Sequence, residues 1–301
     1  MHLFPLFAVA VFAAESVLSP VPEDILLEFA SKSVIIVDVP KPSTSFGELL
    51  PPETPASSVA SESENISPTP TPTPMPTRVT RKKTVTIAAL GDSMTDTLGP
   101  DLPHLKNILT KTYPGTTFIM KNYGVGASNI DYGIQRITNS YNYLGNAIPS
   151  LSSQQPDVVI IESFGYNPYP FDDGALDKHW LALSKAVDTV RAAVPEVKIV
   201  IGSTIAPNAT VFGDGAPGVA FAQNDKWQRV NVIKKYLENA VNFAKSQHLP
   251  LANAFHPSLD SAGNGRLSYI NPGDHIHYSD AGRAFFSQKI ASAIISNKLL
   301  E

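Results

Sequence analysis

Gly91-Asp92-Ser93 is the segment of this sequence whose residue types could do chemistry, and it stands directly after the apolar run 84–90. A β-branched run that breaks into Gly-Asp-Ser is typical of a buried strand that ends in a tight turn. Such a turn places the Ser93 hydroxyl at the carboxyl edge of a sheet, where open α/β folds bind their ligands. A hydroxyl there becomes a nucleophile if a base lies beside it.

A candidate base lies near the other end of the chain, in the segment Asp274-His275-Ile276-His277. His277 can take the proton of Ser93, and Asp274 can orient the other nitrogen of the imidazole ring. The close spacing is workable if both residues sit on a loop ahead of the last predicted helix. The sequence therefore predicts a Ser-His-Asp arrangement that attacks an acyl group.

Acyl transfer to a serine also needs hydrogen-bond donors that stabilise the oxyanion. The candidates are the backbone N–H groups of Ser93 and Gly126 and the side-chain amide of Asn167. Gly126 follows the predicted strand 117–123, and Asn167 follows the predicted strand 157–162. Because the carboxyl ends of parallel strands lie at one edge of a sheet, we expect these donors to gather near Ser93.

The elements that must position these residues alternate between strand and helix from residue 84 onward. The predicted strands are 85–90, 117–123, 157–162, 197–201 and 249–252. The predicted helices are 101–112, 130–144, 177–193, 224–247 and 279–297, the last with Ser279 as its N-cap. Alternation of this kind predicts a three-layer α/β/α sandwich with a mainly parallel five-stranded sheet, formed by residues 84–301.

The first part of the chain differs sharply in composition. Thirteen of the 26 prolines precede residue 80, whereas only one of the 18 glycines does, and residues 67–77 nearly repeat Thr-Pro. Such a segment cannot bury a core and favours extended polyproline II. We expect residues 15–83 to form a disordered Pro/Ser/Thr-rich linker, either a spacer from a membrane or wall or a tail with no further role.

Residues 1–14 contain an apolar run that is too short to span a bilayer but suits the core of a signal peptide. We therefore expect an extracellular or cell-surface protein. The segment before this run has no Lys or Arg, which leaves a misassigned start or a disordered tail as alternatives.

The overall composition excludes several classes of protein. The formal charge of −4 gives no support for a nucleic-acid partner, and the lack of cysteine excludes disulfides and thiolate metal sites. No other stretch is long and apolar enough for an integral membrane span. We expect a monomer with no cofactor.

Two other kinds of site were weighed against the serine mechanism. Asp274, His275 and His277 could bind a metal, but the sequence recruits no further ligand to them. Gly124 and Gly126 resemble the start of a dinucleotide-binding loop, but Asn129 stands where the third glycine is required.

Four blocks of the sequence, taken together, resemble the SGNH/GDSL hydrolase family. The blocks are Gly91-Asp92-Ser93, residues 122–128, Gly165-Tyr166-Asn167-Pro168 and Asp274-His275-Ile276-His277. Each stands after a predicted strand or before the last predicted helix, in the family's order. The resemblance covers about residues 84–301 and no part of the N-terminal third.

The resemblance implies a flavodoxin-like SGNH hydrolase fold and a serine esterase that works through an acyl-enzyme. The catalytic residues that it implies are Ser93, Asp274 and His277, and the oxyanion hole consists of Ser93, Gly126 and Asn167. Gly124 is the alternative glycine. The family's aspartate after the asparagine is replaced by Pro168, so the Asn167 loop must be held in another way.

The predicted function is a secreted or surface-tethered esterase that acts on short-chain carboxylic esters, such as O-acetyl groups. Its substrate would be an acylated polysaccharide or a lipid. The same residues would serve a glycan O-acyltransferase. A catalytically silent glycan-binding module is a third hypothesis, which the intact Ser93, Asp274 and His277 argue against.

Overall fold

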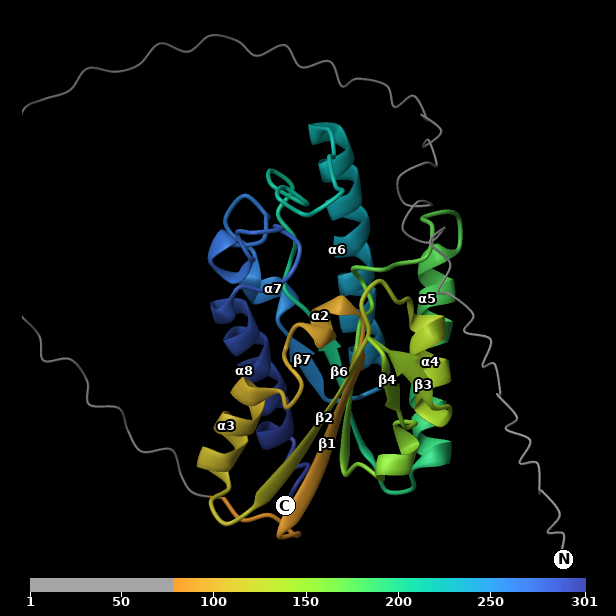
Figure 1. The fold of residues 1–301 in the computed structure, drawn as a ribbon, viewed down its shortest axis with the longest axis vertical. Helices are drawn as coiled ribbons and strands as arrows, with labels where there is room; N and C mark the ends of the chain where they lie inside the picture. Colours follow the sequence, from red (N-terminus) through yellow and green to blue (C-terminus); the bar gives the residue numbers. More distant parts are fainter. Residues whose placement is uncertain (1–77) are drawn as a thin grey trace, which may run out of the picture. The chain divides into compact units, whose positions relative to one another are not determined.

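The computed structural model describes residues 78–301 (Figure 1). The predicted signal peptide at 1–14 and residues 15–77 of the predicted linker lie outside the described residues. The last residues of that linker, 78–83, are attached to the folded domain. The N–H of Arg78 donates to the carbonyl of Thr112 at 2.9 Å, and the N–H of Arg81 donates to the carbonyl of Leu300 at 2.9 Å.

The predicted five-stranded parallel sheet is confirmed. Its strands lie in the order β2-β1-β5-β6-β7, and each neighbouring pair is parallel. The strands are β1 Thr84–Gly91, β2 Thr117–Gly124, β5 Val158–Glu162, β6 Lys198–Ser203 and β7 Leu251–Asn253. Gly91 is opposite Gly124, and Glu162 is opposite Gly202, so the strands finish at a common edge.

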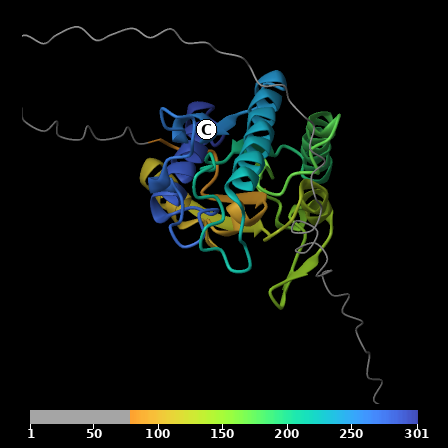
Figure 2. The same ribbon diagram turned by 90° about the horizontal axis from the view of Figure 1, so that it is seen from above.

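Helices cover both faces of this sheet (Figure 2). On one face α3 packs against α8, and on the other α4, α5 and α6 pack in that order. Their bounds are α3 Pro103–Thr112, α4 Ile130–Thr138, α5 Ala175–Ala193, α6 Gln223–Ser246 and α8 Asp280–Ser296. No helix within residues 78–301 is long and apolar enough to cross a membrane.

The core explains why β1 is apolar on both faces. Val85 and Ile87 pack into one hydrophobic cluster with α3 and α8, whereas Ala88 and Leu90 pack into a second cluster with α4 and α5. All four side chains are buried. A strand covered on both faces must be apolar at nearly every position, so the first chemistry-bearing residues can appear only where the strand ends.

The predicted helix 130–144 is wrong in its second half. Helix α4 ends at Thr138, and a hairpin of β3 (Tyr141–Tyr143) and β4 (Asn146–Ile148) follows it. The two turn residues have positive φ, 49° at Leu144 and 78° at Gly145, which suits the two-residue turn of a hairpin. Tyr141 continues the helical spacing of the isoleucines before it, and tyrosine at the alternate positions 141 and 143 also suits a strand.

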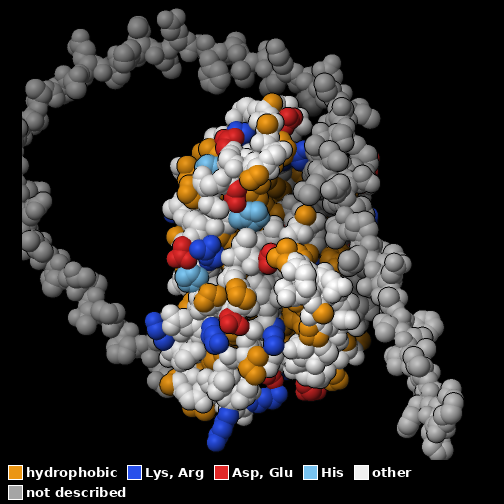
Figure 3. Space-filling view, in the orientation of Figure 1, with side chains coloured by type: hydrophobic (Ala, Val, Ile, Leu, Met, Phe, Trp, Pro, Cys, Tyr) orange, Lys and Arg blue, Asp and Glu red, His pale blue; other side chains and the backbone are white. Residues whose placement is uncertain are grey.

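Several shorter elements complete the domain. They are α2 Ser93–Asp96, α7 Phe255–Ser258 and the 3-10 turns Ser152–Gln154 and Leu267–Tyr269. On the face drawn in Figure 3, lysine and arginine lie mostly toward the end of the sheet where β1 begins. Histidine side chains lie further toward the carboxyl edge of the sheet, and acidic side chains are spread over this face.

Candidate active site

Ser93 is the first residue of α2, directly beyond the end of β1. Asp92 is the N-cap of this helix, with φ −90° and ψ −151°, and its Oδ1 accepts the N–H of Met94 at 2.8 Å. This cap ends the extended strand and starts the turn of α2 directly after it. This holds the half-buried Ser93 at the carboxyl edge of the sheet.

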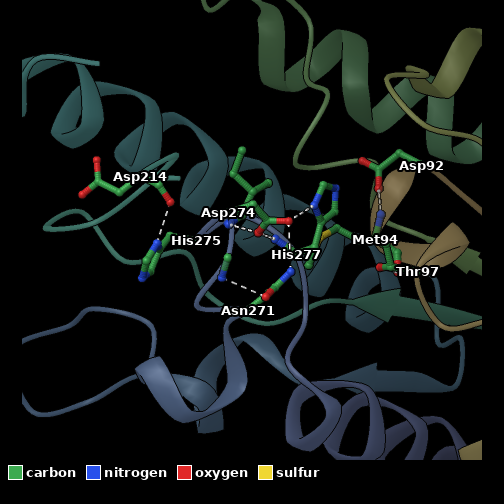
Figure 4. A network of polar contacts seen from close by, with 10 residues as sticks. Asp92, Met94, Thr97, Asp214, Asn271, Asp274, His275 and His277 are labelled. Carbon is green, nitrogen blue, oxygen red and sulfur yellow. Dashed lines mark hydrogen bonds and ion pairs between the residues drawn. The ribbon is translucent and has the colours of Figure 1, made fainter. Parts of the chain in front are cut away.

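His277 and Asp274 are in direct contact on the loop before α8 (Figure 4). The Nδ1–H of His277 donates to Asp274 Oδ2 at 2.9 Å, if the proton lies on the nitrogen that faces the carboxylate. The other oxygen of Asp274 accepts the backbone N–H groups of Ile276 and His277 at 2.9 and 3.0 Å. This tautomer leaves Nε2 of His277 free to accept a proton.

The surroundings of Asp274 favour its charged form. Partial burial raises its pKa, but the hydrogen bonds from Ile276 and His277 outweigh burial and leave the pKa below its usual value. The Nδ2 of Asn271 donates a further hydrogen bond to Oδ2 at 3.2 Å. Asp274 is therefore fixed as a carboxylate, which is the form that stabilises an imidazolium.

The loop of His277 faces the turn that carries Ser93. The His277 ring lies on the side of Asp274 that faces Asp92, the residue before Ser93 (Figure 4), and a positive charge on this ring would act on the Asp92 carboxyl group. Within residues 78–301, no hydrogen bond joins the Ser93 hydroxyl to His277. Catalytic hydrogen bonds are often long in an unliganded enzyme, so proton transfer requires this gap to close when substrate binds.

His275 does not join the same group. Its Nδ1 donates to the carbonyl of Asp214 at 2.7 Å, and its ring points away from His277 (Figure 4). The φ of His275 is 51°, so the loop turns between the two histidines. In the part of the chain that the structure describes, no group of three or more His, Asp or Glu is arranged to hold a metal ion.

Asn167 lies on the loop after β5 and is tied to the Ser93 turn. Its Nδ2 donates to Asp92 Oδ2 at 3.0 Å, and its backbone N–H donates to the carbonyl of Phe164 at 3.2 Å. Asp92 therefore holds the Asn167 side chain next to the Ser93 turn. One hydrogen of the Asn167 amide remains for an oxyanion.

Gly126 and Gly124, the two candidate glycines, are in different situations. The N–H of Gly124 donates to Asn122 Oδ1 at 2.8 Å in a buried position. The N–H of Gly126 donates to the hydroxyl of Tyr143 at 3.0 Å and lies in a partly exposed position. A partner from an exposed hairpin is easier to displace than an internal one, so Gly126 is the better oxyanion donor of the two.

Asn122 and Tyr143 brace the helix that carries Ser93. The Nδ2 of Asn122 donates to the carbonyls of Thr95 and Gly99, each at 2.9 Å. The hydroxyl of Tyr143 donates to Asp96 Oδ2 at 2.7 Å. The short α2 is therefore fixed from β2 and from the β3–β4 hairpin. Tyr166 and Tyr169, on the loop after β5, are buried packing residues.

A buried charge cluster beneath the turn escaped the sequence reasoning. Glu162, the last residue of β5, is 1% exposed, and its Oε2 accepts the N–H of Asp92 at 3.4 Å. Arg136 of α4 is also 1% exposed and donates to the carbonyl of Gly91 at 2.8 Å. The signal for Glu162 was available, because a glutamate that ends a Val-Val-Ile-Ile run must be buried with a partner.

A cavity of about 230 Å³ lies next to Asp96, between α2, the end of β2 and the β3–β4 hairpin. Its lining residues are Asp96, Pro100, Asn122, Gly124, Tyr141, Tyr143, Leu144, Asn146 and Ile148. Both aromatic rings and polar side chains therefore face this space.

Comparison with known proteins agrees with this fold. The model of the GDSL-like lipase/acylhydrolase family matches residues 89–285. A search of curated proteins finds no match. The chain belongs to the GDSL-like lipase/acylhydrolase family, and it is a serine ester hydrolase of the GDSL type.

Solved structures of low sequence identity are similar to this chain. A structure from Parabacteroides merdae described as a GDSL-like lipase has 16% identity and a TM-score of 0.52, over 74% of this chain and all of that one. A family 3 carbohydrate esterase from Clostridium thermocellum has 16% identity and a TM-score of 0.47, over 73% and 100% of the two chains. An acetylxylan esterase from Geobacillus stearothermophilus has 16% identity and a TM-score of 0.46, over 70% and 94%.

Proposed function

We propose that this protein hydrolyses short-chain carboxylic esters, such as O-acetyl groups on a polysaccharide, through Ser93, His277 and Asp274. The observation that carries the proposal is the contact of His277 Nδ1 with Asp274 on a loop that faces the capped Ser93 turn. A histidine fixed in this tautomer opposite a serine is the arrangement that serine acyl transfer requires.

The chemistry follows in two steps. Ser93 Oγ attacks the ester carbonyl while its proton passes to His277 Nε2, and Asp274 stabilises the imidazolium that forms. The N–H groups of Ser93 and Gly126 and the amide of Asn167 bind the oxyanion. The imidazolium then protonates the leaving alcohol. Water, deprotonated by His277, hydrolyses the acyl-enzyme and frees Ser93.

The size of the cavity beside the site favours a small substrate group. Pockets for drug-sized ligands measure about 300–1,000 Å³, and the cavity beside Asp96 is smaller, about 230 Å³. Tyrosine rings and amide side chains in its lining suit a sugar ring more than a long alkyl chain. These features support a short acyl group on a carbohydrate alcohol over a long-chain lipid.

An extracellular or cell-surface location is part of the proposal. The apolar run within residues 1–14 and the Thr-Pro spacer support it. Fractionation of expressing cells, with the mass of the mature protein measured, would test it. Full-length protein that stays in the cytosol with its first residues intact would contradict this location.

The activity is tested with the full chain on p-nitrophenyl esters of short and long acyl chains, next to Ser93→Ala. We expect hydrolysis that is fastest for acetate and that falls by about 10⁴-fold or more in the variant. Turnover that survives in Ser93→Ala would refute the serine mechanism. A preference for long chains would refute the short-chain substrate.

A further inference from the structure

Two carboxyl groups are buried together beneath the Ser93 turn. Asp92 is 0% exposed and Glu162 is 1% exposed, and the backbone N–H of Asp92 donates to Glu162 Oε2 at 3.4 Å, which brings the two carboxyl groups together. Two neighbouring carboxylates that are both buried away from water cannot both remain ionised. A pair of this kind holds one proton between its members.

The neighbouring groups decide which member holds the proton. Asp92 accepts hydrogen bonds from Met94 N–H at 2.8 Å and from Asn167 Nδ2 at 3.0 Å, one on each oxygen. The buried guanidinium of Arg136 also acts on Asp92. Burial raises the pKa of Asp92, but these donors and this positive charge oppose the rise and favour a carboxylate on Asp92 over one on Glu162.

Glu162 has weaker support for a negative charge. Its Oε1 accepts the hydroxyl of Ser163 at 2.6 Å, and its Oε2 accepts the N–H of Asp92 at only 3.4 Å. Burial first, and then the charge of Asp92, raise the pKa of Glu162 well above its usual value. One buried arginine balances one buried carboxylate, so a neutral Glu162 leaves this cluster without net charge.

We propose that Glu162 is a positioning residue that holds a proton and donates it in a hydrogen bond to Asp92, which in turn holds the Asn167 amide at the oxyanion hole. The inference rests on the proposed function, because it takes Asn167 as an oxyanion donor. This chain of hydrogen bonds would hold the Asn167 loop, although Pro168 stands where the SGNH/GDSL pattern has an aspartate.

The close packing of Glu162 against the turn supports this role. A Cβ atom added to Gly91 would lie 2.8 Å from Cβ of Glu162 and 1.9 Å from Oγ1 of Thr95. The glycine therefore allows the end of β1 to approach Glu162 directly. The carboxyl end of Glu162 lies against Asp92, and this polar contact would not be needed if Glu162 only filled space.

An ionised Glu162 would act against catalysis. It would place a second buried negative charge beneath the site where the oxyanion forms, and it would remove the donor that fixes Asp92. The charged or titratable groups around the pair are Arg136, Tyr166, Tyr278 and His277. Burial raises the pKa of both phenols well above its usual value, so at neutral pH neither adds charge.

The test compares full-length wild type, Glu162→Gln and Glu162→Ala on p-nitrophenyl acetate across pH, with thermal unfolding of each variant. The amide introduced by Glu162→Gln can donate to Asp92 without titrating, so most of kcat should remain and any alkaline loss due to Glu162 should vanish. Glu162→Ala should lose about 10²-fold in kcat with KM changed less than about threefold, as for a misplaced oxyanion donor. Equal losses in both variants would overturn the proposal.

The path through Asn167 is tested by the double variant Glu162→Ala/Asn167→Ala. If Glu162 acts through Asn167, the double variant is no slower than Asn167→Ala alone, whereas multiplied losses would contradict the path. Infrared spectroscopy at neutral pH should detect a protonated carboxyl group that Glu162→Gln lacks. If the wild type lacks this infrared signal, the proposal is overturned, whether or not the protein hydrolyses the ester. Lack of any Ser93-dependent hydrolysis, with that signal present, would refute only the proposed function.

Discussion

The amide N–H of Gly126 donates its hydrogen bond to the hydroxyl of Tyr143, 3.0 Å away, so the expected oxyanion donor is already occupied by a side chain of this protein. The same hydroxyl donates to Asp96 at 2.7 Å. Substrate must therefore displace Tyr143 from Gly126 before its carbonyl oxygen can take the N–H. The β3–β4 hairpin thereby competes with the substrate.

Removal of the Tyr143 hydroxyl should therefore make Gly126 more available. We expect Tyr143→Phe to raise kcat/KM for p-nitrophenyl acetate by up to about tenfold, since a neutral hydrogen bond contributes about 1 kcal/mol. Tyr269→Phe, which removes a hydroxyl outside the cavity and the site, is the matched control and should change little. A fall of more than about tenfold in Tyr143→Phe would mean that the hydroxyl positions Gly126 instead of competing for it.

Replacement of Asp274 should disable the base without unfolding the protein. Asp274→Asn removes the carboxylate that fixes the tautomer of His277, and we expect a loss of about 10⁴-fold in kcat. Asp280→Asn is the matched control, because Asp280 also contacts a histidine, His104, at 3.0 Å but lies outside the site. Similar activity in the two variants would exclude Asp274 from the mechanism.

The two glycines after β2 should differ in their tolerance of alanine. At Gly124 an added Cβ would lie 2.0 Å from the backbone nitrogen of Asp96, so α2 would have to move. We expect Gly124→Ala to lower the free energy of unfolding by at least about 3 kcal/mol. At Gly126 the nearest atom is the Tyr143 hydroxyl at 3.2 Å, so Gly126→Ala should cost much less. Chemical denaturation of both variants checks the order.

His179 should make stability depend on pH. It is buried on α5, donates from Nε2 to the carbonyl of Ser163 at 2.8 Å, and burial lowers its pKa from 6.5 to about 4. Below pH 6.5 the unfolded chain binds a proton here and the folded chain does not. Stability should therefore fall by about 3 kcal/mol as the pH falls from 6.5 to about 4.

The control for this prediction separates His179 from other titrating groups. In His179→Gln, the free energy of unfolding measured by chemical denaturation should lose the part of its pH dependence that arises from this imidazole. His248→Gln, at an exposed position, should leave the wild-type curve unchanged. An equal pH dependence in wild type and His179→Gln would contradict the assigned pKa.

The sheet could be predicted from sequence because its strands are short apolar runs that finish at polar residues. The run that ends at Leu90 and the run that ends at Ile161 are buried on both faces, and only a covered parallel strand has that pattern. The hairpin could not be predicted, because its first tyrosine continues the spacing of a helix. Only the positive φ at Leu144 and Gly145 separates the two, and a sequence does not display φ.

The site was predictable where its residues stand next to each other in the chain. Asp274 and His277 are close in sequence, and the structure places them in contact. The contacts of Glu162 with Asp92, and of Tyr143 with Gly126, join separate segments, and no local pattern indicates such pairs. The roles assigned to Ser93 and the oxyanion donors stay predictions until the variants above are measured.

The ends of the described chain meet at the start of the sheet, away from the catalytic edge. Arg78 forms an ion pair with Glu301, and Arg81 bonds to Leu300, beside the beginning of β1 (Figure 1). The strands carry the site to the opposite end. A fusion partner or a solid support joined directly to Arg78 or to Glu301 would therefore leave the substrate's approach open, because both residues lie at the end of the sheet opposite Ser93.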